Sequence, residues 1–358
     1  MQKLDIRHFK YGFATHAVPF NAMAGLAPST KSPRAGDLVA AEVLSIGKHN
    51  MIEDRTGISH HIFPGDRIIS TFGNRYATDQ YEGYVPERTP DEFDLLSVGG
   101  VCGHVVSQHT TMPSPTRLRF LGFVTDLQEQ PLNSAQFGLP RRTPNGTCEV
   151  ILVVGSSMNS GKTTTVGTLV RALSRAGLRV CAAKITGTAA GKDGRYFASC
   201  GAARVLDFTD VGYPSTYLLD LHELLDIFAT LLAHLQDETP DYIVIEVADG
   251  IFQRETRMLL ESVRFRAHIN HVFFAANDSL SAECGVRHLN AMRLPLRATS
   301  GIVTQSPLAI REAETATGLP CLSIERMMSG EVLTLLGLNQ GLPAHSGFRL
   351  QALQPAIP

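Results

Sequence analysis

The chain has 358 residues, 44% of them hydrophobic and 18% charged, which is enough for about two or three domains with sizeable cores. The formal net charge of -2 provides no basic excess for nucleic acid, so we do not expect a nucleic-acid partner. Without a long apolar run, a secretion signal or a Cys-x-x-Cys pair among its six cysteines, the sequence is typical of a cytoplasmic protein with reduced thiols and no membrane contact.

Residues 1–140 are expected to form a small all-β domain, either a barrel or a sandwich. Short stretches rich in β-forming residues alternate with Gly, Pro and Asp turn signals, and no long helical period interrupts them. The expected strands are 36–46, 60–63, 66–73, 82–86 and 99–108.

One loop of this β-rich region combines polar and aromatic residues. The stretch 72–86 contains Arg75 and Tyr76 together with further tyrosines and carboxylates. Such a mixture can form part of a substrate pocket. A solvated hairpin with ordinary aromatic packing would explain the same residues, and both interpretations stay open at this point.

The pattern changes after a Pro- and Gly-containing linker at 139–147. Beyond it, apolar strand-like runs alternate with helical periods, which predicts an α/β domain with a mostly parallel sheet over 141–338 and a loose tail over 339–358. The expected strands are 148–155, 178–187, 241–250, 271–278 and 298–305, and the clearest helices are 161–177 and 218–235.

The stretch VVGSSMNSGKTTT (153–165) is close to a phosphate-binding loop. The usual pattern is Gly, four residues, and Gly-Lys-Ser/Thr, but here Gly155 lies one residue early and Ser156 occupies the usual first-Gly position. The loop follows a predicted buried strand and opens a predicted helix, so its N–H groups would face an anion. The expected nucleotide-binding residues are Gly155, Ser156, Ser157, Met158, Asn159, Ser160, Gly161, Lys162, Thr163 and Thr164.

This five-residue spacing resembles the loop of dethiobiotin synthetase and of the cobyrinic acid diamide synthases. Those loops also place a Gly early and a small hydroxyl residue after it. The resemblance covers about 148–325, and it implies a P-loop NTPase fold, ATP and Mg²⁺ as cofactors, and a homodimer. It also places 301–305 near the adenine. Because Ser157 stands where partition-type ATPases carry a signature lysine, the resemblance argues against that dimer-switch class.

Lys184 ends the second predicted strand of this domain, at the edge of the sheet where ligands bind. The resembling synthetase also has a lysine there, which implies that Lys184 contacts the γ-phosphate or a carboxylate substrate, with Thr186 and Thr188 nearby. A surface lysine with its stem packed on the sheet is the alternative. The predicted catalytic residues are therefore Lys162, Lys184 and Glu246.

Magnesium is expected on Thr163, Glu246 and Asp210. The Thr163 hydroxyl follows the loop lysine, where such loops ligate Mg²⁺. Glu246 ends the apolar strand YIVIE, and a carboxylate on a buried strand without a role would be costly. By the same resemblance Asp210, rather than Asp207, is the second acidic ligand, although a turn aspartate is an equally good interpretation.

Three functions remain open. The first is an ATP- and Mg²⁺-dependent enzyme that passes the γ-phosphate to a small-molecule substrate, activating a carboxylate for amide formation or ring closure in the manner of a ligase. The second is a small-molecule or polynucleotide kinase whose acceptor lies on the N-terminal domain, although the polynucleotide kinases have the four-residue loop. The third is a nucleotide-dependent adaptor or assembly protein with slow ATP hydrolysis.

Overall fold

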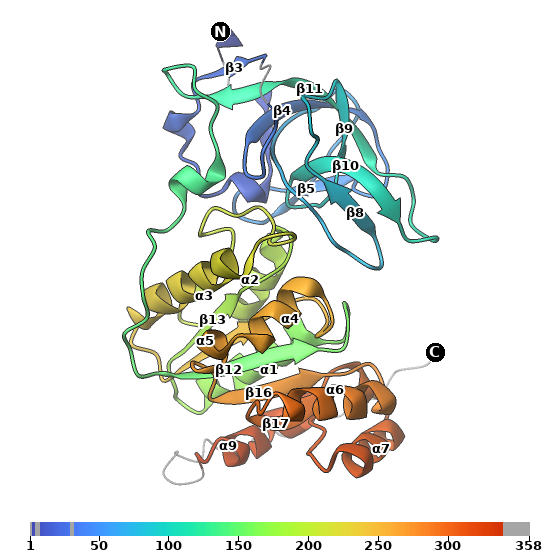
Figure 1. Ribbon diagram of the computed structural model, residues 1–358, viewed down its shortest axis with the longest axis vertical. Coiled ribbons are helices and arrows are strands. Elements are labelled where there is room, and N and C mark those ends of the chain that lie inside the picture. Colours follow the sequence, from blue (N-terminus) through green and yellow to red (C-terminus); the bar gives the residue numbers. More distant parts are fainter. Residues whose placement is uncertain (1, 4–7, 29–31, 339–358) are drawn as a thin grey trace, which may run out of the picture.

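A computed structural model of the chain describes residues 2–3, 8–28 and 32–338 (Figure 1). The expected tail at 339–358 lies outside these residues. In Figure 1 the strands of the first part of the chain lie above, and the helices with the second sheet lie below. None of the helices within the described ranges has the length and apolar character needed to cross a membrane.

The N-terminal part consists of strands and short 3-10 turns within the described residues. The strands are β1 (Gln2–Lys3), β2 (Lys10–Tyr11), β3 (Gly25–Ala27), β4 (Leu38–Ser45), β5 (Met51–Glu53), β6 (Ser59–His61), β7 (Arg67–Phe72), β8 (Tyr81–Tyr84), β9 (Glu92–Leu95), β10 (Val101–Gln108) and β11 (Thr116–Thr125). The 3-10 turns are η2 (Phe13–Thr15), η3 (Phe20–Ala22) and η4 (Ser134–Phe137).

Five of these strands pair in a closed ring. β11 pairs with β4, β4 with β7, β7 with β10, β10 with β9, and β9 again with β11. Phe72, Phe93 and Phe123 are fully buried together with aliphatic side chains of the same strands. The rings of Phe93 and Phe123 lie 5.2 Å and 6.0 Å from that of Phe72, so aromatic contacts fill this core.

Strand β11 was not among the strands expected from the sequence, although it joins β4 to β9 and closes the ring. Its first half, Thr-Arg-Leu-Arg, alternates buried and more exposed side chains, with Leu118 buried and Arg119 exposed. Period-two alternation of this kind is the signature of a half-buried strand, and the two arginines obscured it.

The C-terminal part is a parallel sheet covered by helices. Its six strands have the order β14-β13-β15-β12-β16-β17, and all neighbouring pairs are parallel. Together with the loop after β12, this arrangement is an α/β P-loop fold. The strands are β12 (Glu149–Gly155), β13 (Val180–Lys184), β14 (Val205–Asp207), β15 (Tyr242–Glu246), β16 (His271–Ala275) and β17 (Leu296–Ser300).

The helices flank this sheet and their starts are capped by side chains in several cases. Asp220 accepts a hydrogen bond from the N–H of Glu223 at the start of α3, and Asp278 does the same for Ser281 at the start of α6. The helices are α1 (Lys162–Arg175), α2 (Gly191–Ser199), α3 (Leu221–Gln236), α4 (Arg254–Glu261), α5 (Val263–Arg266), α6 (Ser279–Ala291), α7 (Pro307–Thr317), α8 (Ile324–Met328) and α9 (Glu331–Leu335).

The expected strand over 298–305 is wrong in its second half. Strand β17 ends at Ser300, Gly301 turns the chain with a φ of 95°, and residues 302–305 form the 3-10 turn η5 (Ile302–Gln305). A Cβ on Gly301 would lie 2.3 Å from the carbonyl oxygen of Ser160. The chain turns here because its backbone packs directly against the loop that follows β12.

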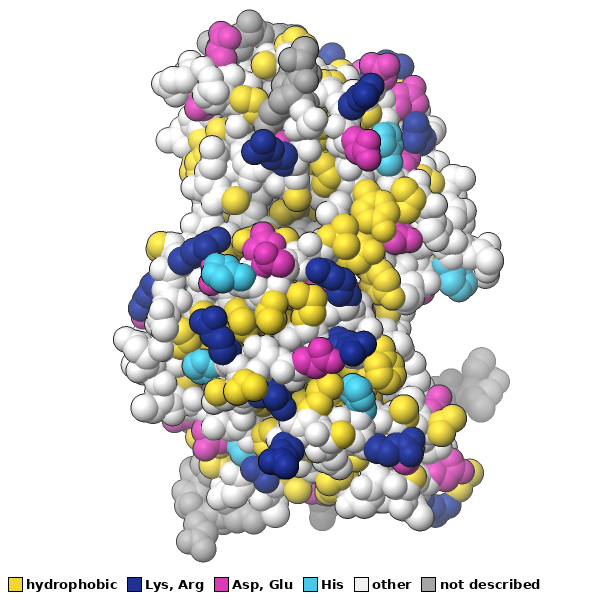
Figure 2. Space-filling view, in the orientation of Figure 1, with side chains coloured by type: hydrophobic (Ala, Val, Ile, Leu, Met, Phe, Trp, Pro, Cys, Tyr) yellow, Lys and Arg dark blue, Asp and Glu magenta, His cyan; other side chains and the backbone are white. Residues whose placement is uncertain are grey.

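The N-terminal part rests on the carboxyl-terminal edge of the parallel sheet. Asp79 accepts a hydrogen bond of 2.6 Å from the Asn159 side chain in the loop after β12. Glu53 accepts one of 2.6 Å from the N–H of Gly191 at the start of α2. Lys and Arg side chains on the face drawn in Figure 2 are scattered singly among acidic and hydrophobic ones, so that face carries no continuous basic stripe.

Candidate functional site

The loop after β12 is shaped by contacts that admit only glycine at two positions. A Cβ on Gly155 would lie 2.3 Å from the Ser160 hydroxyl oxygen and 2.9 Å from the carbonyl oxygen of Ala275. Gly161 has a φ of 99°, and its Cβ would lie 2.9 Å from the Cα of Gly301. A side chain at 155 would meet these atoms, which accounts for a glycine at this early position of the sequence.

Lys162 is the first residue of α1 and lies almost wholly inside the loop. Its side chain is 5% exposed, and its Nζ donates a hydrogen bond of 2.8 Å to the carbonyl oxygen of Ser157. Burial lowers the pKa of Lys162, while the negative charges of Glu246 and Asp249 act in the opposite direction. The ammonium group is thus held against the loop backbone, near the carboxylates of Glu246 and Asp249.

Three polar atoms of the site are buried without a hydrogen-bond partner in the described part of the chain: the hydroxyls of Ser156 and Ser160, and Oε2 of Glu246. An unpaired buried polar group costs about 1–3 kcal/mol. Hydroxyls in a phosphate loop can donate to phosphate oxygens, and a buried carboxylate oxygen can hold a divalent cation. Glu246 lines the cavity, and its unpaired oxygen fits Mg²⁺, whereas Ser156 and Ser160 are not among the described residues that line the cavity.

Thr163 and Glu246 lie together, as expected for two magnesium ligands. The Thr163 hydroxyl oxygen is 3.4 Å from Oε1 of Glu246, whose side chain is 2% exposed. Strands β12 and β15 are neighbours, so a residue at the end of β15 reaches the loop directly. Burial raises the pKa of Glu246, although Lys184 opposes that effect.

Lys184 also belongs to this site. It stands opposite Glu246 in the pairing of β13 with β15, and its Nζ is 3.8 Å from Oε1 of that carboxylate. The same Nζ donates a hydrogen bond to Asp193 in the first turn of α2. Burial favours loss of the Lys184 proton, but the two carboxylates outweigh it and raise its pKa.

Asp193 was not predicted, and it is the residue that orients Lys184. Burial favours its neutral form, but the charge and hydrogen bond of Lys184 outweigh burial and lower the pKa of Asp193. The sequence did carry a signal, because Gly-Lys-Asp-Gly at 191–194 follows closely on the strand that ends in Lys184. Lys192 and Tyr196 of the same helix were also missed, and all three line the cavity described next.

A cavity of about 600 Å³ opens above the loop. Its walls come from the loop itself, from the ends of β13 and β15, and from α2, with Asp249 and Ile302 on further segments. Ile302 lines this cavity, and its N–H donates to the carbonyl oxygen of Ser160 at 3.1 Å, while the adenine contact expected for 301–305 stays a prediction. The volume suits a ligand of nucleotide size.

Asp210, expected as a magnesium ligand, does not line this cavity. Its Oδ1 lies 3.1 Å from Nε2 of His16, and its Oδ2 accepts a hydrogen bond of 2.7 Å from the N–H of Asp207. Asp207 ends β14 and Asp210 follows it, and β14 is three strands from β12 in the sheet order. At about 4.8 Å per strand, the end of β14 is roughly 14 Å from the loop.

Thr186 and Thr188 have structural contacts instead of facing the cavity. The buried Thr186 hydroxyl donates to the carbonyl oxygen of Ala248 and ties the segment after β13 to the segment after β15. Thr188 forms an isolated bridge with Ser215. Neither threonine is among the residues that line the cavity in the described structure.

Arg75 and Tyr76 approach the site from the N-terminal part. Arg75 is 7% exposed, and its Nε has no hydrogen-bond partner within the described ranges. Burial lowers the pKa of Arg75 to about 10, against the charges of Asp249 and Asp79. The ring of Tyr76 lies 5.4 Å from that of Tyr217. The loop that carries Arg75 and Tyr76 is thus fixed beside the cavity through the Asp79–Asn159 hydrogen bond.

Comparison with known proteins yields no match to a known family and no match among curated proteins. Solved structures with a similar fold include the signal recognition particle receptor FtsY from Elizabethkingia anophelis in complex with GDP, at 15% identity, 52% of this chain and a TM-score of 0.37. A second is the signal recognition particle 54 kDa protein from Aeropyrum pernix in complex with GDP, at 18% identity, 54% of this chain and a TM-score of 0.36. A third is a DUF1611 family protein from Anabaena variabilis, at 16% identity, 56% of this chain and a TM-score of 0.38. The chain spans 60%, 49% and 62% of the lengths of these three proteins.

Proposed function

We propose that this protein binds ATP with Mg²⁺ and transfers the γ-phosphate to a small anionic acceptor. One observation carries the proposal: the loop ammonium of Lys162, the cation of Lys184 and the carboxylate of Glu246 converge on one cavity at the carboxyl ends of adjacent strands. This is the arrangement that phosphoryl transfer needs, since catalysis rests on positioning and on neutralising phosphate charge.

The residues of the chain have separate roles in this proposal. Lys162 and the loop N–H groups hold the β- and γ-phosphates. Thr163 and Glu246 hold Mg²⁺, which when bound neutralises charge on the phosphates. Lys184, oriented by Asp193 and close to Glu246, would contact the γ-phosphate of a nucleotide bound in the cavity and stabilise the negative charge that develops during transfer.

A carboxylate is the acceptor best matched to the cations around the site. Lys184 and Lys192 line the cavity, and Arg75, whose Nε has no hydrogen-bond partner in the described residues, is close enough to feel the charge of Asp249. In the proposed step a carboxylate oxygen bonds to the γ-phosphorus while the bond to the β–γ bridging oxygen breaks, and ADP leaves with that electron pair. The product is an acyl phosphate, and no proton is transferred, so no base is required. An amine or other nucleophile then displaces phosphate.

Asp249 supports one alternative, a kinase that acts on a hydroxyl. Its carboxylate faces the cavity, and burial raises its pKa. A hydroxyl acceptor loses its proton as the oxygen bonds to phosphorus, and a carboxylate of raised pKa can accept that proton. The two alternatives differ in their product, because an acyl phosphate is reactive whereas a phosphate ester is stable.

The test is an incubation of the full chain with Mg²⁺, ATP or GTP, and fractionated cell metabolites, in the presence and absence of hydroxylamine. The proposed function predicts ADP release that depends on an acceptor, and a hydroxamate formed when hydroxylamine traps the acyl phosphate. A stable phosphorylated product instead identifies the kinase. Slow hydrolysis that ignores every fraction refutes both. Lys162→Ala serves as the inactive control.

A further inference from the structure

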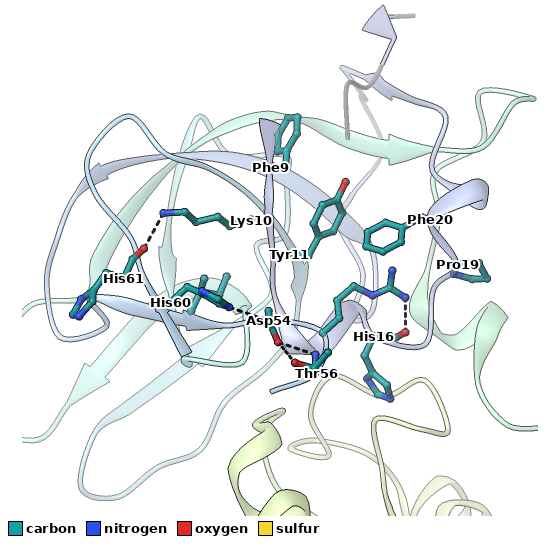
Figure 3. Close-up of a pocket in the computed structure, with 12 residues that line it drawn as sticks. Phe9, Lys10, Tyr11, His16, Pro19, Phe20, Asp54, Thr56, His60 and His61 are labelled. Carbon is teal, nitrogen blue, oxygen red and sulfur yellow. Dashed lines mark hydrogen bonds and ion pairs between the residues drawn. The ribbon is translucent and has the colours of Figure 1, made fainter. Parts of the chain in front are cut away.

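A groove of the N-terminal part is separate from the nucleotide cavity. It has a volume of about 890 Å³ and lies between β2, the 3-10 turns η2 and η3, and the segment that leads into β6 (Figure 3). Its floor is aromatic: Phe9, Tyr11 and Phe20 line it, and the rings of Tyr11 and Phe20 meet edge to face at 5.0 Å. A groove of this size with aromatic walls suits a small organic ligand.

Arg55 is the unusual residue of this groove. Its guanidinium carbon lies 4.1 Å from the centre of the Phe20 ring, and Nη2 donates to the carbonyl oxygens of His16 and Val18 at 2.6 Å each. The other terminal nitrogen, Nη1, is buried and has no hydrogen-bond partner in the part of the chain that the structure describes. Burial lowers the pKa of Arg55, with only Tyr11 opposing it.

No carboxylate within the described ranges compensates this charge. Asp54, the acidic residue of the groove, is already occupied: its oxygens accept hydrogen bonds from Thr56, Ile58 and His60. Lys10 is paired with Asp66. A half-buried guanidinium without a counter-ion is costly, and its planar donor edge matches a carboxylate.

We propose that this groove binds a small aromatic carboxylate, with the ligand ring against Tyr11 and Phe20 and the carboxylate on Arg55. The aromatic walls select a planar ring, and the guanidinium of Arg55, which has no carboxylate partner among the described residues, selects the negative charge. In Figure 3 the side chains of Tyr11 and Phe20 lie side by side along the groove, with the aromatic ring of Phe9 above them and Lys10 farther along. This site is independent of the proposed phosphoryl transfer, because it shares no lining residue with the nucleotide cavity.

The experiment measures binding of 2-naphthoate to the full chain by ligand fluorescence. The chain has no tryptophan, so protein emission interferes little. The neutral isostere 2-naphthamide isolates the contribution of charge. We expect one naphthoate per chain, and naphthamide weaker by about tenfold or more, the usual loss when a charge-assisted hydrogen bond is removed.

Two variants locate the site. Arg55→Gln is expected to weaken naphthoate to the level of naphthamide, and Phe20→Ala to weaken both compounds by a similar factor, because it removes the ring and leaves the charge. Phe20→Ala also keeps the test valid if Arg55→Gln loosens the loop that Arg55 holds. Arg287→Gln and Phe252→Ala are the matched controls, since both side chains are exposed outside the groove, and each should bind as the wild type does.

Three results would overturn the proposal. One is equal affinity for the acid and the amide. Another is unchanged binding by an Arg55→Gln variant whose circular dichroism and melting temperature match the wild type. The last is displacement of naphthoate by ATP in simple competition, which would place it in the nucleotide cavity.

Discussion

The most informative perturbation is the removal of Lys184, because stability and turnover respond to it differently. Its ammonium group is hydrogen-bonded to Asp193 and lies 3.8 Å from Glu246. Lys184→Met leaves two carboxylates close together without their cation. Breaking a buried ion pair costs about 3–5 kcal/mol. The side chains of Lys184 and Asp193 are 17% and 20% exposed, so we expect about 3 kcal/mol, the lower end of that range.

The double variant Lys184→Met/Asp193→Asn separates stability from catalysis. It removes both charges of the pair, and replacing a whole buried pair is often close to neutral. We therefore expect most of the lost free energy of unfolding to return in the double variant. Turnover should stay low in both variants, reduced about 10²–10³-fold, because the cation that we propose contacts the γ-phosphate is missing in each.

Denaturation in urea measures the free energy of unfolding, calorimetry with ATP and Mg²⁺ measures nucleotide affinity, and ADP release measures turnover. ATP affinity should change by no more than about threefold, since Lys162 and the loop remain. Lys184→Arg is the control that keeps the charge. The reasoning fails if Lys184→Met turns over at close to the wild-type rate, or if the double variant recovers turnover along with stability.

Further outcomes are expected from single changes. Gly155→Ala should weaken ATP binding at least about tenfold in calorimetry, because its Cβ would lie 2.3 Å from the Ser160 hydroxyl oxygen. Ser156→Ala should weaken ATP binding about threefold or less. Equal losses of affinity in the two variants would contradict the steric explanation. Asp210→Asn should leave the Mg²⁺ dependence of ADP release unchanged, and a shift would return Asp210 to the metal site. Arg75→Gln should raise the acceptor KM about tenfold without changing nucleotide affinity, a split that a purely structural role would not produce. Burial raises the pKa of Asp207 to about 6, so the folded protein binds this proton more tightly than the unfolded chain does. The free energy of unfolding should therefore fall as pH rises from about 4 through 6, by up to about 1.4 kcal/mol per pH unit. Urea titrations should show a flatter slope for Asp207→Asn.

Lys162, Lys184 and Glu246 could be placed together from the sequence because each one ends a predicted strand or lies in the loop that follows one. Loop residues 155–164 follow one buried strand, and Lys184 and Glu246 each end another. Parallel strands bring their carboxyl ends to one edge, so residues at those ends meet wherever the strands are neighbours. Strands β12, β15 and β13 are consecutive in the sheet, and this adjacency brings the three segments together.

Strand order is the information that local patterns lack. Asp210 follows the end of β14 as Glu246 ends β15, yet β14 is the edge strand and its end lies far from the loop. Asp193 shows the opposite case, a site residue that was not predicted. It lies on a helix, and it meets Lys184 only because α2 starts close to the sheet edge. Strand β11 was overlooked for a different reason: the arginines of its exposed face diluted the apolar signal.

Two arginines of the N-terminal part differ from Lys184 of the P-loop part in how their charges are paired. In the P-loop part, Lys184 is paired with Asp193 and Glu246. In the N-terminal part, Arg75 and Arg55 are each lowered in pKa by burial, and each keeps a nitrogen without a partner among the described residues. Unpaired buried cations destabilise a fold unless an anion from outside completes them. P-loop chemistry is common to many proteins, so selectivity must come from other contacts, and we propose that these two arginines contribute to ligand recognition from the N-terminal part.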